Sequence, residues 1–258
     1  YFRETGEDWA WTPNTLQWNA TGTSYTVLNP AVGGPYPDRA STAVAKSTAI
    51  FGQVGWTPPV LDDRLNITLG ARYTEDRKHG RLVALKGVDP RLGFEFSSDH
   101  IDPAVTVAFD ATPDVNVYAK WGTAYRAGGA NSRSYTYRPF DAEKIETTEI
   151  GLKSQFWERR ARLNLAAYYS DYSDLQIDFS NPNFIGSTET VNTDSPATIK
   201  GFEADGVVQL TSNLSFSAAY AYTHVELGPQ VNPYTGQVVP TAIVYTPENA
   251  YSASLDYT

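Results

Sequence analysis

The chain of 258 residues contains no cysteine and no methionine, and it has no apolar run long enough for a transmembrane helix. Without cysteine there is no disulfide framework, no thiolate metal site and no cysteine nucleophile. A spanning helix needs about 20 mostly apolar residues, whereas a spanning barrel strand needs only about 9–11. Spanning helices are therefore excluded, but a membrane is not. The lack of methionine predicts that the chain is part of a longer gene product.

Charge is also scarce, and basic charge most of all. Charged residues make up 19% of the chain, and 20 Lys+Arg face 29 Asp+Glu, which gives a net charge of -9. This balance argues against a nucleic-acid partner, which would require a basic stripe. The only histidines, His79, His100 and His224, lack the spacing of metal ligands. No catalytic constellation is present, so the sequence predicts no enzyme, no metal site and no cofactor.

What the sequence does contain is a long two-residue alternation of apolar and polar side chains. Leu214, Phe216 and Ala218, for example, alternate with Ser215 and Ser217. This period is typical of β-strands with one apolar and one polar face. Nine strands are predicted in this way, over about 42–57, 64–76, 101–109, 115–126, 146–157, 163–170, 199–210, 214–223 and 249–257.

Short and long connections alternate strictly between these strands. Short turns are predicted at 58–63, 111–114, 157–160 and 211–213, and long polar loops at about 79–99, 128–144, 180–197 and 228–245. A soluble sandwich has no reason to keep its tight turns at one end. Outer-membrane barrels do, because they have short periplasmic turns and long extracellular loops.

The predicted fold class is therefore all-β, a transmembrane antiparallel β-barrel. In hydrocarbon every backbone N–H and C=O must be paired, so only helices and closed barrels can span. Aromatic residues near the ends of the apolar faces are expected to form the interfacial girdles, namely Tyr73, Trp121, Tyr125, Trp157, Tyr169, Tyr220, Tyr222 and Tyr257. Charges of both signs are expected to point into a wide wet lumen, namely Arg72, Lys120, Arg126, Glu149, Lys153, Glu203, Asp205 and Asp256.

Nine strands are an odd number, whereas bacterial barrels have an even one. We expect residues 1–4 to end a preceding barrel strand, residues 5–40 to form a long extracellular loop, and residues 41–258 to hold the barrel strands with their turns and loops. The chain is thus predicted to be a fragment, of about 9–10 strands, of a wider barrel.

Several strings of residues resemble, in the correct order, strands of TonB-dependent outer-membrane receptors. Residues 50–57 (IFGQVGWT) and 64–76 (RLNITLGARYTED) resemble one strand pair of that family, and residues 116–129 (NVYAKWGTAYRAGG) resemble a further strand. The resemblance extends over about 42–258 and continues in residues 149–153 (EIGLK), 166–176 (AAYYSDYSDLQ) and 200–203 (KGFE), while residues 1–4 (YFRE) are similar to the end of an earlier strand.

The resemblance implies a barrel of about 22 strands, closed by an N-terminal plug, that imports a scarce nutrient such as a ferric siderophore. It implies as partners the lipid of the bacterial outer membrane, a small-molecule ligand such as a metal chelate or glycan, and the TonB–ExbB–ExbD complex. That complex would act through the plug, which this chain does not contain. Two alternatives stay open: a passive outer-membrane porin and a soluble β-sandwich carbohydrate-binding module.

The candidate ligand-binding residues are aromatic and arginine side chains in the predicted loops and lumen. Exposed aromatic rings stack on flat or sugar-like ligands, and arginine binds carboxylates through two hydrogen bonds. Such residues can also simply pack long loops together or pair with a plug, and both interpretations stay open here. The candidates are Trp9, Trp11, Trp18, Tyr36, Arg126, Arg133, Tyr135, Tyr137 and Arg138.

Overall fold

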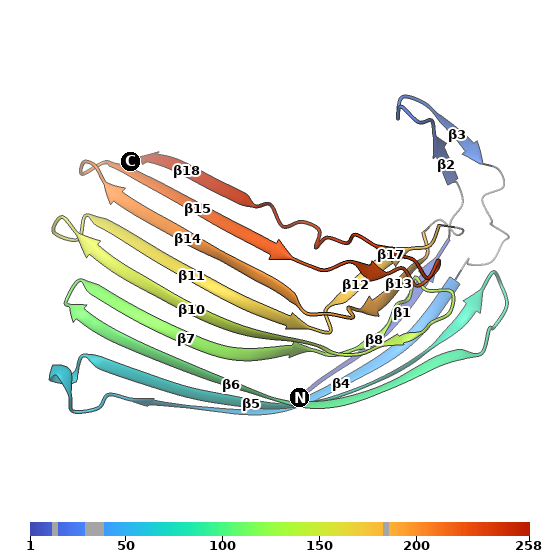
Figure 1. Cartoon of the computed structure of the whole chain (residues 1–258), viewed down its shortest axis with the longest axis horizontal. Coiled ribbons are helices and arrows are strands. Elements are labelled where there is room, and N and C mark those ends of the chain that lie inside the picture. Colours follow the sequence, from blue (N-terminus) through green and yellow to red (C-terminus); the bar gives the residue numbers. More distant parts are fainter. Residues whose placement is uncertain (12–14, 29–38, 183–185) are drawn as a thin grey trace.

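The computed structural model describes residues 1–11, 15–28, 39–182 and 186–258 and shows one large curved antiparallel sheet (Figure 1). Its ten strands pair in sequence order, so the sheet is a meander with β1 and β18 at its edges. The ten strands are β1 (Phe2–Ala10), β4 (Arg39–Trp56), β5 (Leu65–Leu85), β6 (Leu92–Thr112), β7 (Val115–Arg126), β10 (Glu143–Phe156), β11 (Ala161–Ser173), β14 (Ala197–Gln209), β15 (Leu214–Glu226) and β18 (Asn249–Tyr257).

The connections contain smaller elements, which the alternation does not predict. A 3-10 helix, η1 (Leu61–Asp63), lies in the turn between β4 and β5. Four short hairpins lie in the long connections: β2–β3 (Thr15–Trp18, Tyr25–Leu28), β8–β9 (Gly129–Ala130, Pro139–Phe140), β12–β13 (Gln176–Ser180, Thr188–Asn192) and β16–β17 (Gln230–Val231, Val238–Val239). No helix among the described residues is long and apolar enough to cross a membrane.

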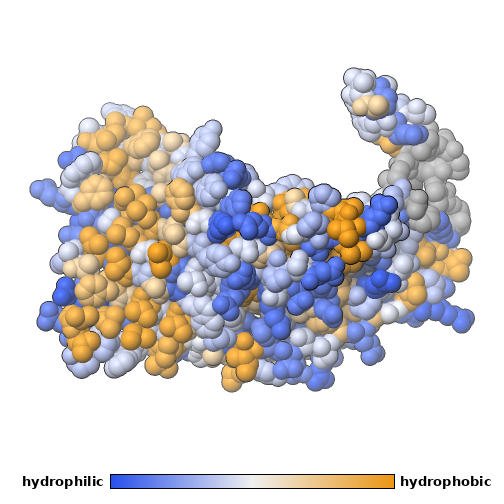
Figure 2. Space-filling view, in the orientation of Figure 1, coloured by the Kyte–Doolittle hydropathy of each residue, from blue (hydrophilic) through white to orange (hydrophobic). Residues whose placement is uncertain are grey.

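The strand register aligns the apolar side chains into rows that run across the whole sheet, as the sequence predicts. We call this side of the sheet the apolar face. One row consists of Phe109, Val117, Leu152, Leu165, Ala204, Tyr220 and Tyr251, each paired with the next on a neighbouring strand. Figure 2 shows apolar residues gathered over the half of the sheet that carries the short turns, and hydrophilic residues over the half that carries the long loops.

The opposite side, the polar face, carries hydrogen-bonded polar rows. Asn116 donates to Asp110 at 2.8 Å, and Asn164 donates to Asp205 at 3.0 Å. Lys153 lies between Asn116 and Asn164 in the same row. Alternating side chains point to opposite faces of a strand, so the register confirms that the sheet has one apolar and one polar side.

Few apolar residues of the described chain are buried, and large ones are exposed on the apolar face. Ile50 is 72% exposed, and Leu255 is 64% exposed. Soluble monomers rarely expose contiguous apolar patches of more than a few hundred Å². A β-sandwich would bury this face against a second large sheet, and the described residues form only one. The soluble sandwich is therefore excluded.

Two predicted boundaries are wrong, because strands extend further toward the loop end than predicted. The strand expected to end at residue 4 continues as β1 to Ala10. The loop expected over about 79–99 is mostly strand, since β5 ends at Leu85 and β6 begins at Leu92. The physical reason is that the polar face of this extension carries apolar side chains, Leu82, Phe94 and Phe96, which pack under a loop.

The end of β7 separates from β6 while it stays paired with β10, which corrects the prediction for Tyr125. Pairing between β6 and β7 stops at Ala104 and Gly122, and β8 then contacts β5 and β6. The Tyr125 hydroxyl donates to Asp76, and its ring lies 5.0 Å from that of His100. Tyr125 therefore packs against β5 and β6 and does not belong to an aromatic girdle.

Candidate functional site

The connections of residues 127–142 and 174–196 meet at the loop end of the sheet and are joined by side chains; we call them the loop assembly. Asn131 Nδ2 donates to the hydroxyls of Thr188 at 3.0 Å and Thr190 at 2.9 Å. The Thr136 hydroxyl donates to Glu189, whose side chain is buried. Because these bonds cross between the two connections, the described part of the assembly is one packed unit.

Asn192 forms the most direct link in the loop assembly. Its Oδ1 accepts a hydrogen bond from the Asp141 backbone N–H at 2.7 Å. Its Nδ2 donates to the backbone oxygens of Asp141 at 2.9 Å and Asp174 at 2.8 Å. One amide side chain thus satisfies both backbone groups of Asp141, as a β-sheet neighbour would.

We expect Asn192→Ala to loosen the loop assembly without unfolding the sheet. Each lost hydrogen bond contributes about 0.5–1.5 kcal/mol, so proteolytic cleavage within residues 128–142 should become about tenfold faster. Asn232→Ala is the matched control, because Asn232 Oδ1 accepts only from the nearby backbone N–H groups of Tyr234 and Thr235. Equal cleavage rates for wild type and Asn192→Ala would show that the hydrogen bonds of Asn192 do not stabilise the loop assembly.

Tyr137 is buried, which corrects its prediction as a ligand-facing residue. It is 2% exposed, and its ring packs edge-on against Phe94 with centroids 5.5 Å apart. Burial raises the pKa of the Tyr137 phenol. Together with Leu82 it forms a small apolar core that holds the loop assembly against β5 and β6. Its aromatic side chain therefore packs a loop, which is the alternative to ligand binding that was considered for all these candidates.

Arg126, by contrast, presents its guanidinium to the open side of the polar face. Its side chain is 61% exposed, and its Nε forms an ion pair with Glu143 Oε1 at 2.9 Å. The Glu143 side chain is only 9% exposed and accepts a hydrogen bond from the backbone N–H of Gln176 at 2.8 Å. Glu143 and Gln176 could not be identified from the sequence, because their roles depend on which connections meet.

The other candidates in the first segment of the assembly lie near its surface. Arg133 and Arg138 are exposed, and the Arg133 carbonyl accepts from the Thr188 N–H at 3.3 Å. Tyr135 is half-buried, and the Lys86 ammonium lies 5.8 Å from its ring centroid. A cation at this distance interacts favourably with the face of an aromatic ring. These residues lie on the same segment as Arg126 but contact different neighbours.

The tryptophan candidates lie elsewhere in the chain: Trp9 on β1, Trp11 directly after β1, and Trp18 on β2. Trp9 and Trp11 are stacked with centroids 6.3 Å apart, and Trp18 meets Tyr25 edge-on at 5.1 Å. Trp9, Trp11 and Trp18 are between 50% and 56% exposed. The structure thus pairs two candidates with each other and Trp18 with Tyr25, which is not a candidate, while Tyr36 lies outside the described residues.

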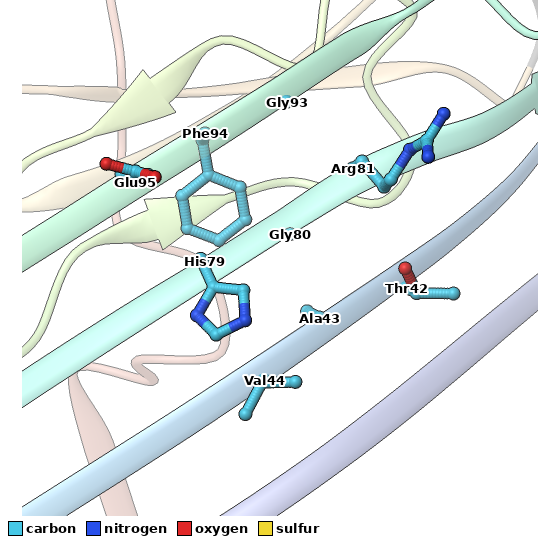
Figure 3. A pocket seen from close by; sticks show the side chains of 9 residues that line it. All are labelled: Thr42, Ala43, Val44, His79, Gly80, Arg81, Gly93, Phe94 and Glu95. Carbon is cyan, nitrogen blue, oxygen red and sulfur yellow. The ribbon is translucent and has the colours of Figure 1, made fainter.

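A groove of about 420 Å³ lies over the loop-side ends of β4, β5 and β6 (Figure 3). In register, Thr42 pairs with Arg81 and then Gly93, and Val44 pairs with His79 and then Glu95. These side chains share the side of the sheet that carries the apolar face. The groove therefore opens away from the loop assembly and contains none of the candidate residues.

The described residues contain no group of three or more His, Cys, Asp or Glu side chains placed to hold a metal ion. The candidate residues at the loop end carry guanidinium and aromatic side chains.

Comparisons with known proteins identify the family. The family described as "TonB dependent receptor-like, beta-barrel" matches residues 2–258. The chain is 28% identical over 131 residues to the metal-pseudopaline receptor CntO of Pseudomonas aeruginosa, covering 50% of this chain and 17% of that protein. It is 26% identical over 140 residues to the probable TonB-dependent receptor BfrD of Bordetella pertussis, covering 51% and 19%.

Solved structures show the same fold. The ferric-catecholate import receptor Fiu of E. coli aligns with TM-score 0.65 and 16% identity, covering 99% of this chain and 38% of that one. The ferric yersiniabactin uptake receptor FyuA of Yersinia pestis aligns with TM-score 0.63 and 20% identity, covering 95% and 34%. The chain thus spans about a third of these structures and 17% of the first curated relatives. These proteins are receptors for transport and not enzymes, and the chain belongs to the TonB-dependent receptor β-barrel family.

Proposed function

We propose that this chain is the wall of an outer-membrane receptor that binds a scarce nutrient, such as a ferric siderophore or another metal chelate, and imports it actively. The observation that carries the proposal is the combination of family membership with a sheet that is apolar on one side and polar on the other. The apolar face would contact lipid, and the polar face would line the lumen through which the ligand passes.

The loop assembly supports a receptor that captures its ligand before transport. Hydrogen bonds join its two connections, and Arg126 forms an ion pair with Glu143 beside them. A packed loop surface binds a ligand with a smaller loss of conformational entropy than mobile loops would. In this proposal the extracellular loops capture the chelate, and the TonB–ExbB–ExbD complex supplies energy through a plug.

A passive porin is the alternative, and the energy dependence of uptake separates the two. We expect cells carrying the receptor to accumulate radiolabelled iron, supplied as ferric citrate and as an uncharged ferric tris-hydroxamate chelate, only when TonB is present. A tonB deletion should reduce accumulation to the level of cells that lack the receptor. Uptake of either chelate that survives this deletion but requires the receptor would favour a porin.

A further inference from the structure

We propose that Arg126 recognises anionic groups of the ligand, and that the ligand is a metal chelate bearing carboxylates. The inference rests on the proposed function and adds the chemical class of the substrate. Glu143 and Gln176 act as positioning residues that hold the Arg126 guanidinium in place.

The position of Arg126 follows from the strand register. Arg126 is the last residue of β7 and pairs with Glu143, the first residue of β10. Residues two apart share a face, so Arg126 lies on the same side as Lys120, which pairs with Glu149 on the polar face. The guanidinium is therefore placed where the predicted lumen meets the loop assembly.

An ion pair with Glu143 holds the Arg126 side chain from beneath. Both oxygens of Glu143 have a partner: Oε1 lies 2.9 Å from Arg126 Nε in the ion pair, and Oε2 accepts a hydrogen bond from the Gln176 N–H at 2.8 Å. The Gln176 side chain in turn donates to the backbone oxygens of Asp141 at 3.0 Å and Ala127 at 3.4 Å. These contacts join the ends of β7 and β10 to β12, so the Glu143 carboxylate cannot rotate away from Arg126.

The contact with Glu143 leaves part of the Arg126 guanidinium available for a ligand. The ion pair with Glu143 runs through Nε, and among the described residues neither Nη group of Arg126 has a hydrogen-bond partner. A planar guanidinium held at one edge can still donate two parallel hydrogen bonds to a carboxylate. Because Glu143 is buried and Arg126 is 61% exposed, it is the cation that faces a ligand.

The connection that follows β7 carries more basic than acidic residues. Residues 126–143 contain Arg126, Arg133 and Arg138 against Asp141 and Glu143, although the chain as a whole has a net charge of -9. A cationic stretch at the mouth of a lumen raises the local concentration of anions. Carboxylates match the bidentate geometry of arginine.

The test compares two probes on the receptor purified in detergent. Binding of ferric citrate and of an uncharged ferric tris-hydroxamate chelate is measured by tryptophan fluorescence. Arg126→Gln should weaken ferric citrate binding about tenfold or more, because it removes charge-assisted hydrogen bonds, and should change binding of the uncharged probe less than twofold. Arg126→Lys should bind ferric citrate with intermediate affinity, since lysine keeps the positive charge but cannot donate two parallel hydrogen bonds to a carboxylate.

The positioning role has its own readout. Glu143→Gln should weaken ferric citrate binding by several fold and speed the reaction of Arg126 with phenylglyoxal, because the guanidinium is released. In the wild type, ferric citrate should slow that reaction. Arg77→Gln is the matched control, because Arg77 pairs with Glu75 at 2.5 Å and shares a side of the sheet with Tyr73 of the apolar face.

Unchanged ferric citrate binding by Arg126→Gln would overturn the proposal, and so would equal loss of both probes. A wild-type receptor that binds only the uncharged probe would also overturn it, yet would leave the proposed transport function intact. Uptake that does not depend on TonB, together with normal ferric citrate binding, would contradict the proposed transport function and leave the inference about Arg126 intact.

Discussion

Replacing Leu165 by arginine is expected to lower the free energy of unfolding by about 2–4 kcal/mol, as for charges at the lipid-facing midplane of barrels. Leu165 lies in the middle of β11, between Leu152 and Ala204 in a row of the apolar face, and it is 41% exposed in the isolated chain. Phe216→Arg, on β15 of the same face, should cost a similar amount. Urea titration of the receptor folded into lipid vesicles measures both.

Substitutions on the polar face provide the control for this prediction. Lys153→Gln changes a residue in the polar row next to Asn164, on the face proposed to line the lumen, and should cost less than about 1 kcal/mol. The opposite ranking, with Lys153→Gln more harmful than Leu165→Arg, would mean that the apolar and polar faces are exchanged.

Gly201→Ala is expected to destabilise the sheet by about 1–3 kcal/mol, the usual cost of overpacking. A Cβ atom at Gly201 would lie 2.1 Å from the backbone oxygen of Tyr222 and 2.7 Å from the hydroxyl oxygen of Tyr168. Tyr168 faces Gly201 across β11 and β14, so its ring occupies the space that the glycine leaves. The clash with backbone cannot be relieved by rotating a side chain.

Gly52→Ala is the matched control, because a Cβ there would meet no atom within 4 Å. It should change stability by less than about 0.5 kcal/mol. Equal urea midpoints for the two variants would show that the contact between Tyr168 and Gly201 is looser than described.

The repeated features of this fold could be predicted from the sequence. Alternation over residues such as 214–223 predicted strands, their two faces and the all-β class, because side chains of a strand point alternately to opposite sides. The short turns at 157–160 and 211–213 were predicted because polar and turn-forming residues interrupt the alternation there. The family resemblance of residues 116–129 and 149–153 is confirmed by the family match.

The candidate site was predictable by residue type but not by arrangement. Tyr135 and Tyr137 look alike in sequence, yet one is half-buried near Lys86 and the other is packed in a core. Tyr125 continues the alternation of its strand, but its hydroxyl bonds to Asp76 on another strand. Nothing local distinguishes these outcomes, because each depends on a contact with a residue far away in the chain.

The sequence by itself determined that this protein is a ribbon of long strands with one apolar and one polar side. That property is set by the pattern of neighbouring residues, and every strand carries it independently. Only the tertiary structure decided that Asn192 joins two connections and that Glu143 holds Arg126. Hydrogen bonds between residues some 18 to 59 positions apart require the sheet to bring those segments together first.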